Sequence, residues 1–312
     1  MNLVAKLATG VAMTFALTAG AHAAEPESCQ TVRFSDVGWT DITATTAATT
    51  VVLEALGYKT ETTVLAVPIT YASLKNGQID VFLGNWMPTM EGDIAAFREE
   101  GSVETVRANL HGAKYTLAVP KYTYDKGLKT FADIAKFKDD LDGKIYAIEP
   151  GNDGNRLILD MVDKDTFGLK GFDVVESSEQ GMLAQVARSE KRNKDIVFLG
   201  WEPHPMNANF EMAYLDGGDD VFGPDYGGAT VYTNVRKGYV AECPNVGKLL
   251  QNLEFTLPME NEIMGAILND GKDGKDAARE WLKKHPDVYG VWLDGVTTFD
   301  GSAGLDAVKK AL

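Results

Sequence analysis

Tryptophan residues recur in this chain where predicted strands end. Trp86 lies in the segment FLGNWMP and Trp201 in the similar segment FLGWEP, so each buried strand is predicted to run into a loop that contains Trp and Pro. Trp39 lies in the loop GWTD, and Asp41 follows it at the predicted N-cap of a helix. Ligands of open parallel sheets bind just beyond the carboxyl ends of the strands. These residues are therefore candidates for one shared site, although a tryptophan at such a place is more often a packing anchor.

Aromatic rings and a carboxylate together suit a cation. The face of an aromatic ring is apolar and carries the negative part of the ring quadrupole, and tryptophan offers the best such face. A carboxylate such as that of Asp41 adds a formal counter-charge and accepts hydrogen bonds on two oxygens. The chemistry of these residue types therefore points to a small cationic ligand.

Strand-like and helix-like segments alternate along the chain, which is typical of an α/β fold with mostly parallel sheets. The predicted strands are 31–34, 59–67, 79–83, 115–119, 144–148, 173–175 and 195–198. The predicted helices are 42–56, 68–77, 155–163, 180–190, 246–257, 260–268 and 276–284. The length of 312 residues suggests two domains, and no linker or low-complexity tract divides them. We therefore expect two lobes, one inserted into the other.

The composition excludes several classes of protein. Hydrophobic residues make up 45% of the chain and charged residues 24%, which is ordinary for a globular protein and excludes a disordered chain. The 30 basic residues against 45 acidic ones give a net charge of −15. Such an acidic protein repels phosphate backbones and anionic lipid, so we expect neither nucleic acid nor a membrane surface as partner.

The first 23 residues are predicted to be a cleaved secretory signal peptide. Lys6 is the only charge there, an apolar stretch follows it, and the sequence AHA at 21–23 suits signal peptidase. Export places the two cysteines, Cys29 and Cys243, in an oxidising compartment. One structural disulfide is their simplest pairing, and two unpaired buried thiols are the alternative.

The sequence after residue 23 contains no recognisable catalytic motif. Its histidines, His111, His204 and His285, are far apart and have no metal-binding spacing. A G-x-S-x-G nucleophile elbow is absent, and no G-x-G-x-x-G follows a predicted strand. We therefore expect a protein that is not an enzyme and that holds no cofactor or metal.

Five segments resemble the substrate-binding proteins of ABC importers for quaternary amines. They are SDVGWTDI, DVFLGNWMP, HGAKYTLAVP, IEPGNDGNR and FLGWEPHPMN, in this order between residues 35 and 207. The resemblance covers essentially the whole chain after residue 23, and the positions of both cysteines fit it. It implies a two-lobed periplasmic binding protein of type II (a Venus flytrap), whose α/β lobes close on a ligand. We expect lobe 1 to comprise 24–112 and 232–312, and the inserted lobe 2 to comprise 113–231.

The resemblance also implies roles for six residues. Four of them form an aromatic box around a trimethylammonium group: Trp39, Trp86, Tyr115 and Trp201. Asp41 and Asn152 occupy the positions that contact the polar end of the ligand. The plainer alternatives are a helix N-cap for Asp41 and a turn-forming residue for Asn152. A trimethylammonium group is charged but has no N–H to donate, so aromatic faces suit it better than hydrogen-bonding groups.

From this resemblance we expect a periplasmic monomer that takes choline to a membrane permease. The main alternative ligand is glycine betaine, because its carboxylate would suit the amides of the helix that follows Asn152, with Arg156 nearby. Asp41 favours choline, because it would repel that carboxylate. Acetylcholine carries the same head group and is a further candidate. A secreted choline-ester hydrolase is the alternative of a different class, but no activated nucleophile is visible near the box residues.

Overall fold

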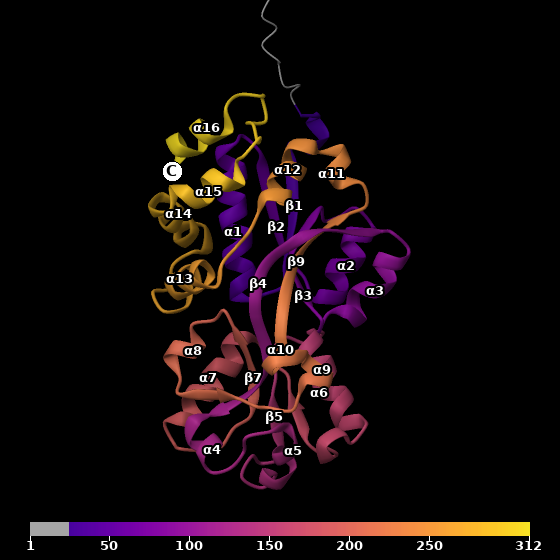
Figure 1. The fold of residues 1–312 in the computed structure, drawn as a ribbon, viewed down its shortest axis with the longest axis vertical. Coiled ribbons are helices and arrows are strands. Elements are labelled where there is room, and N and C mark those ends of the chain that lie inside the picture. The colour runs from indigo at the N-terminus through magenta and orange to yellow at the C-terminus, as the bar shows by residue number, and fades with distance from the viewer. Residues whose placement is uncertain (1–24) are drawn as a thin grey trace, which may run out of the picture.

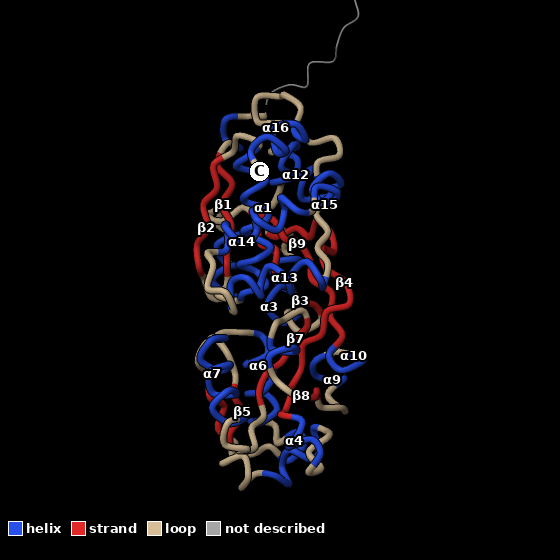
Figure 2. Tube along the Cα trace, turned by 90° about the vertical axis from the view of Figure 1, so that its left-hand side faces the viewer, coloured by secondary structure: helices blue, strands red, loops and turns tan. Residues whose placement is uncertain are grey.

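The computed structural model describes residues 25–312, so the predicted signal peptide, residues 1–23, lies outside the described residues. The chain forms two α/β lobes stacked along its long axis (Figure 1). Two strands, β4 (Val103–Pro120) and β9 (Gly228–Arg236), pass from one lobe to the other. Figure 2 shows the same two lobes from the side. In the described part of the chain, no helix has the length and apolar character that a membrane span requires.

One sheet runs through both lobes in the order β2-β1-β3-β9-β4-β7-β5-β6, and β8 pairs with β4. The outer strands of each lobe are parallel, as expected, namely β1 with β2 and β3, and β5 with β6 and β7. The central pairs, β3–β9, β9–β4 and β4–β7, are antiparallel, because β4 and β9 cross between the lobes in opposite directions. The other strands are β1 (Thr31–Asp36), β2 (Lys59–Val64), β3 (Val81–Met87), β5 (Lys144–Tyr146), β6 (Asp173–Val175), β7 (Phe198–Glu202) and β8 (Met212–Tyr214).

Helices surround the sheet in each lobe. Those of lobe 1 are α1 (Thr40–Ala55), α2 (Val67–Lys75), α3 (Glu91–Glu99), α11 (Tyr239–Glu242), α12 (Pro244–Asn252), α13 (Leu257–Leu268), α14 (Gly274–Lys284), α15 (Pro286–Trp292) and α16 (Gly304–Ala311). Those of lobe 2 are α4 (Lys121–Asp125), α5 (Phe131–Ile134), α6 (Asp153–Asp163), α7 (Glu179–Glu190), α8 (Met206–Asn209), α9 (Asp219–Phe222) and α10 (Pro224–Gly227). Short 3₁₀ turns are η1 (Glu27–Cys29), η2 (Ala135–Phe137) and η3 (Thr166–Gly168).

Helix α1 is buried along most of its length and carries the loop of Trp39 at its start. It packs against α13 and α14, which explains how a helix so rich in threonine is stable despite the low helix propensity of that residue. The threonine hydroxyls are satisfied inside the helix: Thr45 donates to the carbonyl of Asp41 at 3.1 Å, and Thr49 to that of Thr45 at 2.8 Å. The start of α1 is therefore held firmly beside the sheet.

The crossing strands contain an irregularity between the lobes. The register of β4 against β9 shifts between Leu110 and Ala113, and Gly112 adopts a φ of 76°, which favours glycine. The expected lobe boundaries, 112/113 and 231/232, fall within these two strands. A bulge with a glycine at its centre provides a place where the strands can bend.

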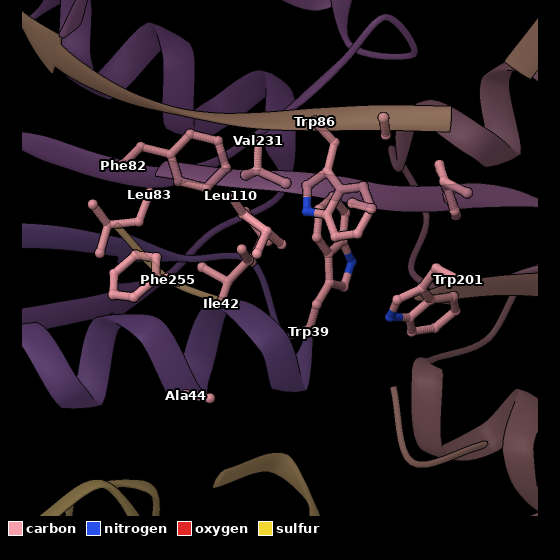
Figure 3. Packing of buried hydrophobic residues seen from close by; sticks show 14 of the residues in the cluster. Trp39, Ile42, Ala44, Phe82, Leu83, Trp86, Leu110, Trp201, Val231 and Phe255 are labelled. Atoms are coloured by element: carbon pink, nitrogen blue, oxygen red, sulfur yellow. The ribbon is translucent and has the colours of Figure 1, made fainter. Parts of the chain in front are cut away.

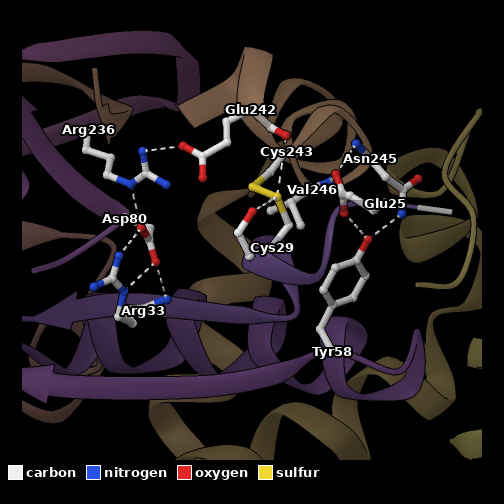
Figure 4. The surroundings of a disulfide bond; sticks show 11 residues. Glu25, Cys29, Arg33, Tyr58, Asp80, Arg236, Glu242, Cys243, Asn245 and Val246 are labelled. Atoms are coloured by element: carbon white, nitrogen blue, oxygen red, sulfur yellow. Dashed lines mark hydrogen bonds and ion pairs between the residues drawn. A yellow bond between two sulfur atoms is a disulfide. The ribbon is translucent and has the colours of Figure 1, made fainter. Parts of the chain in front are cut away.

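The far end of lobe 1 ties the beginning of the described chain to a distant segment. Cys29 and Cys243 form a disulfide across a sequence separation of 214 (Figure 4). The Glu25 carboxylate accepts a hydrogen bond from the Tyr58 hydroxyl, and it also accepts the backbone N–H of Asn245 at 2.6 Å, in the first turn of α12. A carboxylate at this end of a helix satisfies an otherwise unpaired donor.

Candidate ligand-binding site

A cavity of about 250 Å³ lies at the junction of the two lobes. It is lined by Trp39, Asp41, Trp86, Tyr115, Ile148, Asn152, Asp153 and Trp201. The lining thus brings together all six residues selected from the sequence and adds Ile148 and Asp153. Figure 3 shows Trp39, at the start of α1, beside Trp86 on β3, with Trp201 on β7 across from them.

The expectation that Trp86 and Trp201 lie in loops beyond their strands was wrong. β3 extends to Met87 and β7 to Glu202, so both tryptophans lie within the last residues of a strand. Each strand ends before a proline, Pro88 or Pro203, which has no N–H to continue a ladder. The indoles are therefore fixed by sheet backbone, and Trp86 and Trp201 are each only 3% exposed.

Tyr115 connects the two sides of the aromatic box (Trp39, Trp86, Tyr115 and Trp201). Its ring centroid lies 6.0 Å from that of Trp86 and 6.2 Å from that of Trp201, with edge-to-face angles of 60° and 80°. Its hydroxyl donates to Asn152 Oδ1 at 2.7 Å. A Cβ at Gly154 would lie 2.1 Å from this hydroxyl, so only glycine allows the approach. These contacts hold the Tyr115 ring between the two tryptophans.

Asp41 contributes a buried carboxylate to the cavity. Its Oδ2 accepts the indole N–H of Trp86 at 3.1 Å, whereas its Oδ1 has no hydrogen-bond partner among the described residues. Burial, and next the negative charge of Glu179, raises the pKa of Asp41 to about 8. The N-cap of α1 is Trp39, and Asp41 lies in the first helical turn, so the plain N-cap interpretation of Asp41 was wrong. An unpartnered buried acceptor that faces a cavity is available to a ligand.

Asn152 is the N-cap of α6 and lines the same cavity. Its Oδ1 accepts the backbone N–H of Asn155 at 3.0 Å in addition to the Tyr115 hydroxyl, and its Nδ2 donates to Asp153 Oδ1 at 3.0 Å. The side chain therefore holds the tyrosine and the helix start together. Burial is the main reason why the pKa of Asp153 is raised to about 6, and Asp93 adds to the effect.

Buried acidic groups surround the cavity. Glu179 and Glu260 are 0% and 2% exposed, and the pKa of Glu260 is raised well above its usual value by burial and by the charge of Asp41. The cationic Arg156 is occupied elsewhere, because its guanidinium donates to Asp93 at 2.7 Å and to the Thr89 carbonyl at 3.0 Å. The field in the cavity thus favours a cation over an anion. The residues described as its lining include no Ser, Thr, Cys, Lys or His.

Comparison with known proteins agrees with this geometry. Residues 30–284 match the family model described as the substrate binding domain of an ABC-type glycine betaine transport system. The chain belongs to this family. Its members are substrate-binding domains of transporters, so the present substrate-binding protein is not an enzyme.

Solved structures show the same fold. An ABC-transporter choline binding protein in complex with choline is 72% identical, with a TM-score of 0.91, and the match covers 92% of this chain and 99% of that one. A choline binding protein in an unliganded semi-closed conformation is also 72% identical, with a TM-score of 0.84 and coverage of 91% and 99%. A lactococcal OpuAC in its closed conformation with glycine betaine is 26% identical, with a TM-score of 0.76 and coverage of 84% and 98%.

Proposed function

We propose that this substrate-binding protein captures choline in the periplasm and delivers it to the permease of an ABC importer. The observation that carries the proposal is the convergence of four aromatic side chains and the Asp41 carboxylate on one small cavity. Its similarity to the structure described with choline, at 72% identity, supports the same ligand. The aromatic box then encloses the trimethylammonium group, and Asp41 Oδ1 accepts the choline hydroxyl.

The energies of these contacts are sufficient for capture. Each cation–π contact contributes about 0.5–2 kcal/mol, with the larger values in desolvated sites, and each buried methyl group adds about 0.8 kcal/mol. A Kd of 1 μM corresponds to about −8 kcal/mol. These gains exceed the cost of ordering the side chains and closing the lobes, so micromolar or tighter affinity is expected.

Glycine betaine is the second candidate ligand, because the family model and the lactococcal OpuAC are both described with it. Three features of the cavity oppose its carboxylate. The ionised form of Asp41 would repel it, and Arg156 is already engaged by Asp93. The Asn155 N–H in the first turn of α6 is also occupied, because it donates to Asn152. A carboxylate would therefore meet a like charge and no free guanidinium.

Titration calorimetry on refolded, ligand-stripped protein tests the proposal. Choline is expected to bind at micromolar Kd or tighter, and glycine betaine much more weakly. D41N should weaken choline more than betaine, because the asparagine removes the charge that distinguishes them. Tight binding of betaine with weak binding of choline would still agree with an aromatic box around the trimethylammonium group. It would contradict the assignment of Asp41 to the polar end of the ligand. A folded protein that gives no heat with either ligand would contradict the proposal as a whole.

The proposal also includes the lobe boundaries, the oligomeric state and the removal of the signal peptide. Lobe 1 comprises residues 24–112 and 232–312, and lobe 2 comprises 113–231, so the ligand bridges the lobes. Trp39, Asp41 and Trp86 belong to the first lobe. Tyr115, Asn152 and Trp201 belong to the second. The protein acts as a monomer after removal of residues 1–23, which N-terminal sequencing and light scattering of the exported protein would check.

A further inference from the structure

A buried carboxylate outside the cavity links the two lobes. Glu179, the first residue of α7 in lobe 2, accepts two hydrogen bonds from Thr40 of lobe 1. Its Oε2 accepts the Thr40 backbone N–H at 2.8 Å, and its Oε1 accepts the Thr40 hydroxyl at 2.5 Å. Oε1 also lies 3.2 Å from His204 Nε2. The three residues are at most 3% exposed, and none of them lines the cavity.

The hydrogen bonds around His204 define which ring nitrogen carries the proton. The backbone N–H of Met206 donates to His204 Nδ1 at 2.9 Å, so Nδ1 is an acceptor and is unprotonated. The proton is therefore on Nε2, which donates to Glu179 Oε1. Three donors thus converge on one carboxylate, which is the arrangement that an ionised side chain needs in a buried place.

Each partner of Glu179 is adjacent to a wall of the cavity. Thr40 lies between Trp39 and Asp41 in the chain, and both of these line the cavity. On the other lobe, the His204 ring packs edge-to-face on Trp201, with ring centroids 4.9 Å apart. One carboxylate therefore connects walls of the cavity that come from both lobes.

We propose that Glu179 is a positioning residue for ligand capture, and that Thr40, Glu179 and His204 form a clasp that holds the lobes closed around the ligand. The clasp exists only when the lobes are together, so it stabilises the closed form relative to the open one and slows ligand release. The inference rests on the proposed function only for the identity of the ligand. The clasp is a contact between the two lobes and does not depend on which ligand is bound.

A second bridge between the lobes has a different character. Arg156 of lobe 2 pairs with Asp93 of lobe 1 at 2.7 Å, but its side chain is 38% exposed. An exposed pair is screened by salt and contributes little, whereas the clasp is shielded from solvent. Salt should therefore leave the clasp's contribution to closure largely intact.

The variant E179Q tests the clasp with little change of shape. A glutamine has a single acceptor oxygen, so its NH₂ must face one of the donors, either Thr40 or His204. Because charged hydrogen bonds of this kind are lost, we expect the choline Kd to rise about tenfold or more. The change should appear in the dissociation rate, followed by stopped-flow tryptophan fluorescence, with the association rate within about twofold. In small-angle scattering, unliganded E179Q should be more expanded than the wild type.

Matched variants separate the clasp from general damage. E190Q removes the same charge from the other end of α7 and should behave as the wild type. T40V removes the hydroxyl donor and should accelerate release, whereas T40S should restore most of what T40V loses. These paired threonine variants keep the test valid if E179Q does not fold.

The outcomes distinguish this inference from the proposed function. If E179Q and T40V release choline at the wild-type rate and scatter like the wild type, the clasp is wrong. A lowered Tm with unchanged rates would assign Glu179 a purely structural role and would also overturn it. If the wild type binds no choline, the proposed function fails, while the scattering of the unliganded variants still decides whether the clasp holds the lobes together.

Discussion

The indole N–H of Trp86 donates to Asp41 Oδ2 at 3.1 Å, so a wall of the aromatic box orients the carboxylate that shares the cavity with it. Trp86 comes from β3 and Asp41 from α1, and each is at most 3% exposed. The second oxygen, Oδ1, has no partner among the described residues. This one hydrogen bond leaves half of a buried carboxylate available to the ligand.

Choline affinity should depend on pH because of Asp41. Its pKa of about 8 without ligand means that much of it is protonated at neutral pH, whereas a bound cation favours the ionised form. Binding therefore releases a proton, and affinity should fall by up to tenfold per unit as pH drops below about 8. Calorimetry in two buffers of different ionisation enthalpy measures this proton. D41N should show a flat profile, and a flat profile in the wild type would contradict the assignment.

The same carboxylate should affect the stability of the unliganded protein. Because folding raises the pKa of Asp41, its contribution to stability is fully present below the unfolded pKa of about 4 and is lost as pH rises through about 8. The D41N variant has no carboxylate at this position, so it does not lose this stability as pH rises. Its Tm relative to the wild type should therefore be higher at pH 8 than at pH 5 in thermal melts without ligand. An equal difference at both pH values would argue against a titrating Asp41.

W201A should weaken choline binding by about tenfold or more, because it removes a cation–π wall and the surface that buries a methyl group. The control is W281A. Trp281 stacks on His285, with ring centroids 3.8 Å apart, and does not line the cavity. Calorimetry compares the two variants with the wild type. Equal affinity in W201A and W281A would remove Trp201 from the box.

D80A should destabilise lobe 1 without changing the aromatic box. Asp80 is 1% exposed and pairs with Arg33 and Arg236, each at 2.7 Å (Figure 4). Burial alone would raise the pKa of Asp80, but the hydrogen bonds from the two guanidiniums outweigh it and lower the pKa. The Arg33 and Arg236 side chains are 35% and 17% exposed, so water can replace part of what Asp80 provides, and the loss should be about 1.5–3 kcal/mol. Denaturant unfolding measures the loss. E61Q, at an exposed position of β2, serves as control and should change stability little.

The disulfide should stabilise the fold and leave ligand affinity unchanged. The double variant C29S/C243S removes a cross-link over a sequence separation of 214, for which chain entropy predicts a loss of about 5 kcal/mol. Thermal melts of the wild type with and without reductant, and of the variant, measure the effect. A choline Kd that rises while the variant remains folded would show that this bond also acts on the site.

Local patterns in the sequence were sufficient to select Trp39, Asp41, Trp86 and Trp201, because a Trp beside Gly or Pro near a strand end is visible within one segment. Tyr115 and Asn152 were selected only through the resemblance to the binding proteins for quaternary amines. Ile148 and Asp153 also line the cavity but were not selected. The strands themselves were less predictable. β4 was expected only over 115–119, because its first half bears exposed residues such as Glu104 and lacks a regular alternation. β9 was not predicted at all, because its residues TVYTNV at 230–235 do not alternate between polar and apolar, although burial alternates from Gly228 to Thr233.

The clasp was beyond sequence reasoning for a different reason. The clasp residues come from three separate segments of the chain, namely those of Thr40, Glu179 and His204. The sequence around each residue gives no indication of a partner in the other lobe. His204 lies close to Trp201 in the sequence, but it has no metal-binding spacing and no Ser or Cys beside it, which gives no sign of its role. Glu179 reads as an ordinary acidic residue at the start of a helix. Their roles arise from the way the lobes meet, which only the fold reveals.

The pairing of β3 with β9 also has a consequence for the order in which the protein takes shape. As the chain emerges from its N-terminus, β3 has an open edge until residues 228–236 arrive. The segment between them, which contains β5, β6 and β7, emerges without interruption and can assemble meanwhile. The edge of β3 beside Trp86 is therefore completed only by the last strand of the chain. A chain that ended before residue 228 would contain every lining residue of the cavity and still lack the strand that pairs with Trp86.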